Sequence, residues 1–193
     1  MKLLHIDSSI LGQHSASREL GAAIVARWQA DVPGLEIAYR DLAADPIPHL
    51  DGSDLAKADP TAAARAERVL RDFLDADIVV IGAPMYNFSI PSTLKAWIDR
   101  VAVAGRTFRY TADGPEGLAG GKKIIVASTR GGFHDAASGR DFVEPYLRFV
   151  FGFLGVTDVE FVTASGLSIS AEQRSESMQA ALASIPSPLA KAA

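Results

Sequence analysis

The sequence contains no cysteine, which excludes disulfide bonds, thiolate catalysis and cysteine-ligated metal centres. It also lacks any apolar run near the roughly 20 residues that a membrane-spanning helix needs. Lys and Arg number 19 against 23 Asp and Glu, and the formal net charge of −4 argues against nucleic acid as a partner. The short apolar start before Asp7 has no signal-peptide features. These absences favour a soluble cytoplasmic protein without membrane or nucleic-acid partners.

Several site signatures are missing as well. The sequence shows neither a Gly-x-Gly-x-x-Gly motif after its first apolar segment nor a Walker lysine loop. The four histidines form no ligand set, with His5 expected in the core and His14 and His49 in solvated loops. Asp7 stands alone between Ile6 and Ser8, so the acidic cluster that holds Mg²⁺ is absent. We therefore expect no metal site.

The most informative stretch is the one from residue 77 to residue 100. Its apolar, β-branched run Ile78–Gly82 predicts a strand buried on both faces, as in a parallel sheet. A loop with Met, Tyr and Phe follows at 84–88, and apolar residues then recur at helical spacing. In open α/β sheets, ligands bind at the carboxyl ends of the strands. An apolar loop at that edge is costly in water unless something flat covers it.

The remaining segments alternate between strand and helix patterns. We expect strands at 3–7, 35–40, 78–82, 122–128 and 158–163, and helices at 19–30, 61–75, 92–103, 141–154 and 171–184. A long irregular connection covers 41–60, and a short β ribbon starts at 107–110 with its turn at 113–115. This alternation predicts a three-layer α/β fold with a five-stranded parallel sheet. Right-handed crossovers favour the flavodoxin-like order 2-1-3-4-5, in a single domain spanning 1–193.

Hydroxyl side chains surround the start of the first expected helix. Ser8, Ser9, Ser15 and Ser17 lie there, where free backbone N–H groups and the helix dipole favour an anion. Serine hydroxyls add donors without adding charge, which suits a single phosphate monoester. Ordinary capping of the helix by Ser15 or Ser17 explains the same residues equally well.

Two further loops follow strands and carry groups suited to a flat ligand. In Met85–Phe88, the Asn87 amide can donate and accept against the edge of a heterocycle while its aromatic neighbours cover the ring. In Thr129–Gly132, paired glycines let the backbone approach a ligand, although Gly-Gly alone is more typical of a turn. Together with the serine loop, these loops open on one sheet edge and favour FMN. His134 can donate a hydrogen bond to the ring edge or a substrate, or can be an ordinary loop histidine.

Several sequence blocks carry a family resemblance that covers essentially the whole chain. They are Ser8-Ser9-Ile10-Leu11, Ser15-Ala16-Ser17, Ala83-Pro84-Met85-Tyr86-Asn87-Phe88, Thr107-Phe108-Arg109-Tyr110-Thr111, Gly114-Pro115-Glu116-Gly117-Leu118 and Arg130-Gly131-Gly132. Together they resemble the bacterial FMN-dependent NADH azoreductases, also described as FMN-dependent NADH:quinone oxidoreductases. One departure is Ala16, where several relatives carry a longer polar residue, so that only a backbone contact to phosphate is left.

The resemblance implies an enzyme that binds one non-covalent FMN per subunit and takes hydride from NADH. It implies ping-pong transfer to quinones or to azo compounds, which are cleaved to amines, with the chemistry on FMN and no catalytic protein nucleophile. The implied FMN contacts are Ser9, Ser15, Ala16 and Ser17 at the phosphate, and Met85, Tyr86, Asn87, Phe88, Thr129, Arg130, Gly131 and Gly132 at the ring. Family members are homodimers, and by analogy Tyr110 and Phe153 wall the neighbouring subunit's pocket.

An electron carrier of the flavodoxin type is the alternative to an enzyme. Such a carrier serves protein partners and is expected to show a strongly acidic rim for docking. The charge here is mild and mixed in sign along the chain. We therefore prefer the enzyme.

Overall fold

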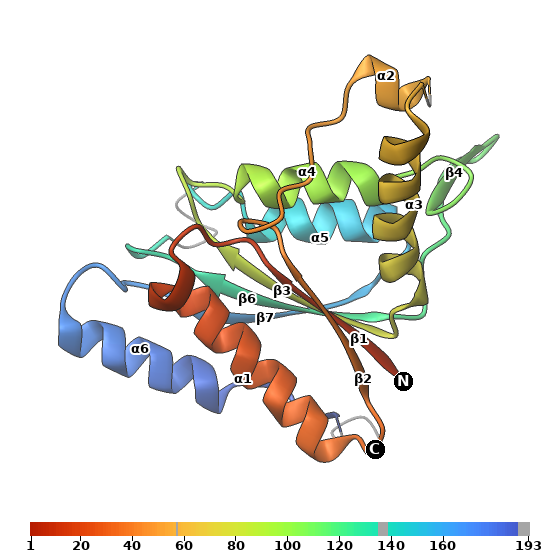
Figure 1. The fold of residues 1–193 in the computed structure, drawn as a ribbon. Coiled ribbons are helices and arrows are strands. Elements are labelled where there is room, and N and C mark those ends of the chain that lie inside the picture. Colours follow the sequence, from red (N-terminus) through yellow and green to blue (C-terminus); the bar gives the residue numbers. More distant parts are fainter. Residues whose placement is uncertain (57, 135–138, 189–193) are drawn as a thin grey trace.

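The computed structural model describes residues 1–56, 58–134 and 139–188 (Figure 1). Its larger sheet has the order β2-β1-β3-β6-β7, and all pairings in it are parallel. The strands are β1 (Lys2–Asp7), β2 (Glu36–Asp41), β3 (Ile78–Pro84), β6 (Lys123–Thr129) and β7 (Asp158–Ala164). The five-stranded parallel α/β sheet predicted from the sequence is confirmed. The spatial order matches the expected 2-1-3-4-5 when only the strands of this sheet are counted. The last two strands are numbered β6 and β7 because β4 and β5 form a separate ribbon that comes before them in the chain.

Helices cover both faces of this sheet and give three layers (Figure 1). One face is covered by α1 (Ala16–Asp31) and α6 (Ala171–Ala183), and the other by α3 (Pro60–Asp75), α4 (Ser92–Val101) and α5 (Glu144–Phe153). Two short helices, η1 (Gly12–His14) and α2 (Gly52–Leu55), lie in connections. Each face has its own apolar cluster, as expected for a sheet buried on both sides.

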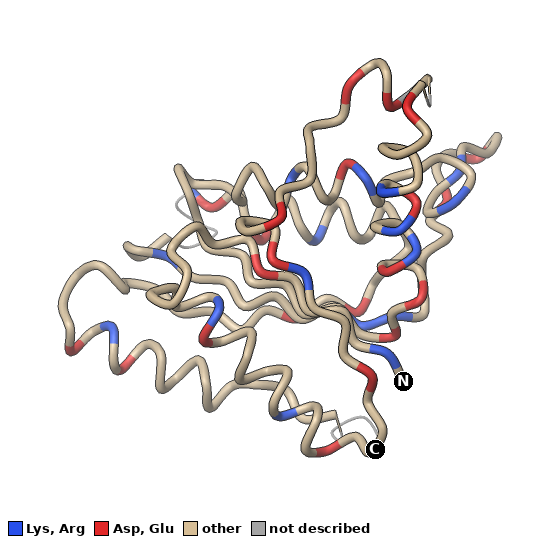
Figure 2. The backbone as a smooth tube through the Cα atoms, viewed as in Figure 1, with Lys and Arg blue, Asp and Glu red and all other residues tan. Residues whose placement is uncertain are grey.

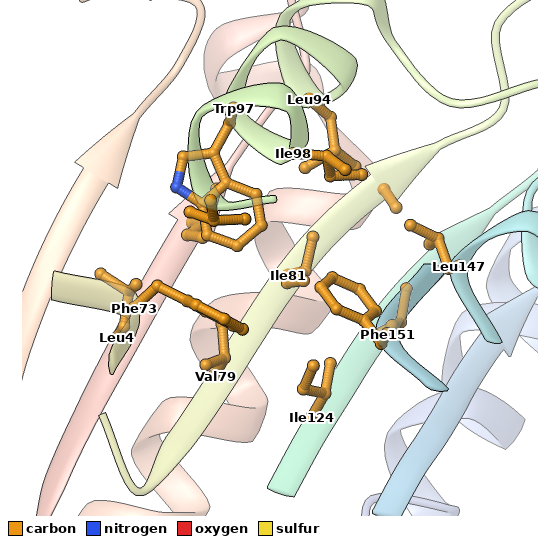
Figure 3. Close-up of a cluster of buried hydrophobic side chains, with 14 of the residues drawn as sticks. Leu4, Phe73, Val79, Ile81, Leu94, Trp97, Ile98, Ile124, Leu147 and Phe151 are labelled. Carbon is orange, nitrogen blue, oxygen red and sulfur yellow. The ribbon is translucent and has the colours of Figure 1, made fainter. Parts of the chain in front are cut away.

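The core beneath α3, α4 and α5 is built on large aromatic side chains (Figure 3). The Trp97 ring lies edge-on to Phe73 with 5.6 Å between ring centroids, and Phe151 lies 6.4 Å from Phe73. All seven residues of β3 are buried, as the apolar run predicts. Because well-packed cores are rigid, this packing fixes the carboxyl end of β3, where the apolar loop begins.

Three helix boundaries differ from the sequence prediction by two or more residues, because side chains bond to the backbone there. The helix expected at 19–30 begins at Ala16, since the Ser15 hydroxyl oxygen accepts a hydrogen bond from the Arg18 N–H. The helix expected at 141–154 begins at Glu144, since a carboxylate oxygen of Asp141 accepts hydrogen bonds from the N–H groups of Val143 (2.8 Å) and Glu144 (3.3 Å). The helix expected to reach residue 103 ends at Val101, whose carbonyl accepts a 2.7 Å hydrogen bond from the Thr107 hydroxyl. The α2 turn was not predicted within 41–60.

The β ribbon consists of β4 (Phe108–Thr111) and β5 (Gly114–Gly117), which pair antiparallel. Its turn lies at residues 112–113, slightly before the expected 113–115, because Thr111 pairs with Gly114. A Cβ atom on Gly117 would lie 2.1 Å from the Gly155 nitrogen, so only glycine allows the ribbon to approach the end of α5 so closely. In Figure 1 the ribbon lies at the far end of α4 from the β3 loop.

Acidic and basic residues are interspersed along the backbone (Figure 2). Within the described ranges, none of the helices combines the length and the apolar character needed to cross a bilayer. In the same ranges, no group of three or more His, Asp or Glu side chains is placed to hold a metal ion.

Candidate functional site

The predicted loops converge on a cavity of about 220 Å³ at the carboxyl ends of β1, β3 and β6. It is lined by eight of the predicted FMN contacts, namely Ser9, Ser15, Ala16, Met85, Tyr86, Thr129, Arg130 and Gly131. Six further residues complete the lining: Leu11, His14, Pro84, Leu167, Ser168 and Arg174. A larger cavity of about 860 Å³ lies beside α3 and α4, but none of the predicted contacts lines it. The smaller cavity is therefore the candidate site.

The serine loop both caps α1 and lines the cavity. The Ser15 hydroxyl oxygen accepts a hydrogen bond from the Arg18 N–H (3.3 Å) and lies 3.0 Å from the Ser17 hydroxyl. The N–H groups of Ala16 and Ser17 belong to the first helical turn, so they have no acceptor within the helix. The two sequence interpretations of this loop are thus compatible, because a capped helix start still presents donors to an anion.

Tyr86 links the loop after β3 to the serine loop. Its hydroxyl lies 3.1 Å from the Ser9 hydroxyl and accepts a hydrogen bond from the Ile10 N–H (3.2 Å). The Ser8 hydroxyl in turn donates to the carbonyl of Gly82 in β3 (2.6 Å). These contacts join segments more than 70 residues apart in the sequence and hold the two loops as one surface.

A strained turn presents Asn87 and Phe88 beside the cavity. Tyr86 and Ser89 exchange backbone hydrogen bonds of 2.9 and 3.1 Å around them. Asn87 has φ 49° and Phe88 has φ 70°, the pair of positive values that a type I′ turn requires. The left-handed region costs a residue such as Phe88 roughly 1–2 kcal/mol. Phe88 is 49% exposed, and its ring lies edge-on to His134 with 5.6 Å between the ring centroids, so the strained turn holds an aromatic residue at the surface.

Arg130 contributes backbone to the site, while its side chain turns away to Asp141. The two side chains form an ion pair in which each is only 5% exposed. The same Asp141 caps α5, so this pair connects the glycine loop with the first turn of that helix. The neighbouring Thr129 carbonyl accepts a hydrogen bond from the Met85 N–H (2.8 Å) and connects the loop with the β3 loop.

A fourth loop, after β7, completes the cavity and was missed in the sequence. Leu167 and Ser168 donate backbone hydrogen bonds to the carbonyls of Arg130 (3.1 Å) and Gly131 (2.9 Å), and they line the cavity. Arg174 in α6 lines it as well. The signal was Gly166, a turn glycine with φ +74° that follows the last strand at the same sheet edge. His14, expected only to be solvated, is exposed and lines the cavity.

The remaining predicted contacts lie next to the lining. Ser17 is fully buried behind Ser15. A Cβ atom on Gly132 would lie 3.2 Å from the His134 ring nitrogen, which places that glycine against the histidine. Together with Asn87 and Phe88, these residues surround the cavity without forming its wall.

Asp7 has no acidic neighbour in the sequence, but side chains from distant parts of the chain contact it in the fold. The Tyr39 hydroxyl donates to one Asp7 oxygen (2.9 Å), and the His5 Nε2 atom lies 3.6 Å from the other. Arg18 donates two hydrogen bonds to Asp41, of 2.7 and 2.8 Å. It also donates to the Ser9 carbonyl (2.8 Å), so this charged cluster braces the serine loop.

Two pKa values report the environment of this cluster. The hydrogen bond from Arg18 lowers the pKa of Asp41 below its usual value, against the opposing effect of burial. Burial, followed by the hydrogen bond to Asp7, raises the pKa of Tyr39 to about 12. At neutral pH the cluster therefore holds a charged Asp41 and a neutral, donating Tyr39.

Tyr110 and Phe153 do not line the cavity of their own chain. They are joined through Phe108, whose ring centroid lies 5.6 Å from Tyr110 and 4.7 Å from Phe153. Tyr110, on the ribbon, is 76% exposed. Their role in a neighbouring subunit's pocket stays a prediction.

Comparisons with known proteins agree with this geometry. The family model described as "Flavodoxin-like fold" matches residues 1–187. An FMN-dependent NADH:quinone oxidoreductase of Stenotrophomonas maltophilia is 60% identical over 187 residues, covering 97% of this chain and 95% of the relative. The crystal structure of an azoreductase from Bacillus anthracis has a TM-score of 0.85 and 30% identity, covering 96% of both chains.

A second solved structure that resembles this chain contains bound FMN. It is an FMN-dependent NADH-azoreductase from Bacillus anthracis in complex with FMN, with a TM-score of 0.86, 26% identity and 95% coverage of both chains. Nearly the whole chain is matched in the family model, in the curated relative and in both structures. The chain therefore belongs to the flavodoxin-like-fold family and, within it, to the FMN-dependent NADH:quinone oxidoreductases.

Proposed function

We propose that this chain is an FMN-dependent NADH:quinone oxidoreductase that also reduces aromatic azo compounds. The observation that carries the proposal is the cavity at the sheet edge. It combines hydroxyl and amide donors at the start of α1 with a Met-Tyr-Asn-Phe turn after β3. The 60% identity to a protein named for this activity supports it over 97% of the chain.

The donor set fits FMN. Ser9, Ser15 and the Ala16 N–H would hold the phosphate, with the buried Ser17 supporting Ser15. Met85–Phe88 and the backbone of 129–132 would hold the ring. Among the described residues that line the cavity there is no Asp or Glu to repel an anion. When bound, one non-covalent FMN per subunit supplies the two-electron chemistry that the side chains cannot.

The protein's own part is positioning and exclusion of water. Phe88, held in its strained turn, would cover one side of the ring and keep water from it. The N–H groups of Gly131 and Gly132 would donate hydrogen bonds toward the ring edge, where negative charge is best stabilised by fixed dipoles. His134, beside Phe88, would donate to the substrate. Since donor and acceptor need the same exposed ring face, NADH would leave before the acceptor binds, which is a ping-pong order.

The exposed aromatic side chains support a homodimer with active sites at the interface. Tyr110, Phe142 and Phe149 are 76%, 57% and 74% exposed, and aromatic side chains are enriched at protein–protein interfaces. Tyr110 and Phe153 would wall the partner's pocket. Light scattering tests this, and a mass near one chain would contradict it. A single domain over 1–193 and a cytoplasmic location stay predictions from the sequence.

Steady-state kinetics test the function. We expect FMN-loaded protein to oxidise NADH rapidly with benzoquinone, more slowly without an acceptor, and to decolourise methyl red. Parallel double-reciprocal plots at several acceptor concentrations would support the ping-pong order. Free FMN at the same concentration is the control. No NADH oxidation above that control, with either acceptor, would exclude the enzyme.

A further inference from the structure

The inner face of α6 brings a cation to the cavity. Met178 and Ala181 are buried in the cluster shared with α1. Arg174 precedes Met178 by four residues, so it lies on the same face one turn earlier. Because α6 and α1 pack side by side on one face of the sheet (Figure 1), Arg174 lines the same cavity as His14 and Ser15.

Within the described residues, Arg174 has no acidic partner. Over the described part of the chain, no ion pair or side-chain hydrogen bond joins its guanidinium to another residue. The positions three and four residues away in the helix are Ser170, Ala171, Ser177 and Met178, and none of these is acidic. A half-buried guanidinium without a carboxylate partner is available to a ligand.

The other two guanidinium groups near the cavity are already paired. Arg130 is bound to Asp141 in a buried ion pair. Arg18 is bound by two hydrogen bonds to Asp41 and by a third to the Ser9 carbonyl. Among the described residues around the cavity, Arg174 is therefore the arginine left to balance a bound anion.

We propose that Arg174 is a cationic anchor for the terminal phosphate of FMN and selects FMN over riboflavin. The proposal rests on the proposed function. Ser15 and the first-turn amides of α1 are neutral donors, and a guanidinium adds the charge-assisted hydrogen bonds that favour a phosphate dianion. The terminal phosphate of FMN is a dianion near neutral pH, whereas each phosphate of the NADH pyrophosphate carries a single charge, so an unpaired cation in this cavity favours FMN.

Flavin titration of the apoprotein tests the proposal directly. Flavin fluorescence quenching gives Kd for FMN and for riboflavin, in the wild type, in Arg174→Ala and in the matched control Arg27→Ala. Arg27 also lies on the α1 and α6 side of the sheet, but it pairs with Asp31 in the last turns of α1, away from the cavity. We expect Arg174→Ala to raise Kd for FMN by about 10- to 100-fold and Kd for riboflavin by less than about twofold. Arg27→Ala should change neither.

Two further readouts keep the outcomes distinct. In the wild type, added salt should weaken the binding of FMN more than the binding of riboflavin. In Arg174→Ala, most of this difference in salt dependence should disappear. Equal loss of both flavins, or no change in Kd for FMN, would overturn the role of Arg174 while leaving the proposed function intact. An unchanged Kd for FMN with a raised KM for NADH would assign the cation to the dinucleotide and also overturn it. Wild-type protein that binds no FMN would contradict the proposed function and this inference together.

Discussion

The buried pair Arg130–Asp141 gives the sharpest test of how the site is held. Each side chain is 5% exposed, so Asp141→Asn leaves a buried guanidinium without a counter-charge. This should lower the free energy of unfolding by about 3–5 kcal/mol. The amide oxygen can still accept from the Val143 N–H, so the α5 cap survives. Asp141→Ala removes the cap too and should cost about 1 kcal/mol more. We expect FMN retention to fall in both variants, because Arg130 connects the glycine loop to α5.

Urea unfolding of the apoprotein measures these losses without a contribution from ligand binding. With m near 1–3 kcal/mol/M, a loss of about 3–5 kcal/mol in Asp141→Asn should lower the urea midpoint by about 1–5 M. The matched control is Glu116→Gln, which removes the acid of an exposed pair whose Arg109 and Glu116 side chains are 58% and 48% exposed. Its loss should stay below about 1 kcal/mol. If Asp141→Asn and Glu116→Gln shift the midpoint equally, the buried pair does not fix the loop.

Three further outcomes follow from the site. Phe88→Gly relieves left-handed strain, so apoprotein stability should stay level or rise by up to about 1 kcal/mol while FMN binding weakens; a clear loss of stability would contradict this. The pKa of Asp41 is lower in the folded protein than in the unfolded chain, where it is about 3.9. The charged carboxylate therefore stabilises the fold above the unfolded pKa, and this stabilisation is lost as pH falls through the folded pKa. Asp41→Asn should therefore be less stable than wild type at pH 7 but converge with it in acid, and a constant gap would contradict the ion pair. Absorbance titration of the tyrosines should show one group near pH 12 that Tyr39→Phe removes. The raised pKa means that Tyr39 stabilises the fold below about pH 10 and loses this contribution as pH rises toward 12.

The sheet and its site edge could be predicted because their signals are local. The apolar run of β3 specifies a strand buried on both faces, and the helical spacing after Pro91 specifies α4. Once parallel strands are assigned, their carboxyl ends meet at one edge of the sheet, so loops far apart in the sequence are predicted to lie close together. The serine, aromatic and glycine loops do line or surround one cavity.

What could not be predicted depends on contacts between distant residues. Asp141 pairs with Arg130 across the glycine loop, which no local pattern indicates. Asp7 reads as an isolated acid until β2 brings Tyr39 beside it. Arg174 is one of several arginines in the sequence, and only the packing of α6 against α1 brings it to the cavity. Which partner each of these charged side chains binds depends on the tertiary structure.

The loop from Pro84 to Phe88 is the central element of the proposed flavin site, and one titration tests it most directly. Apoprotein carrying Tyr86→Ala and Asn87→Ala together would be titrated with FMN beside the wild type, with far-UV circular dichroism to show that the sheet is intact. We predict one FMN per chain in the wild type and at least about tenfold weaker binding in the double variant, whose lost contacts are each worth about 1 kcal/mol. Equal flavin content and equal Kd in the two proteins would contradict the assignment of this loop to the flavin.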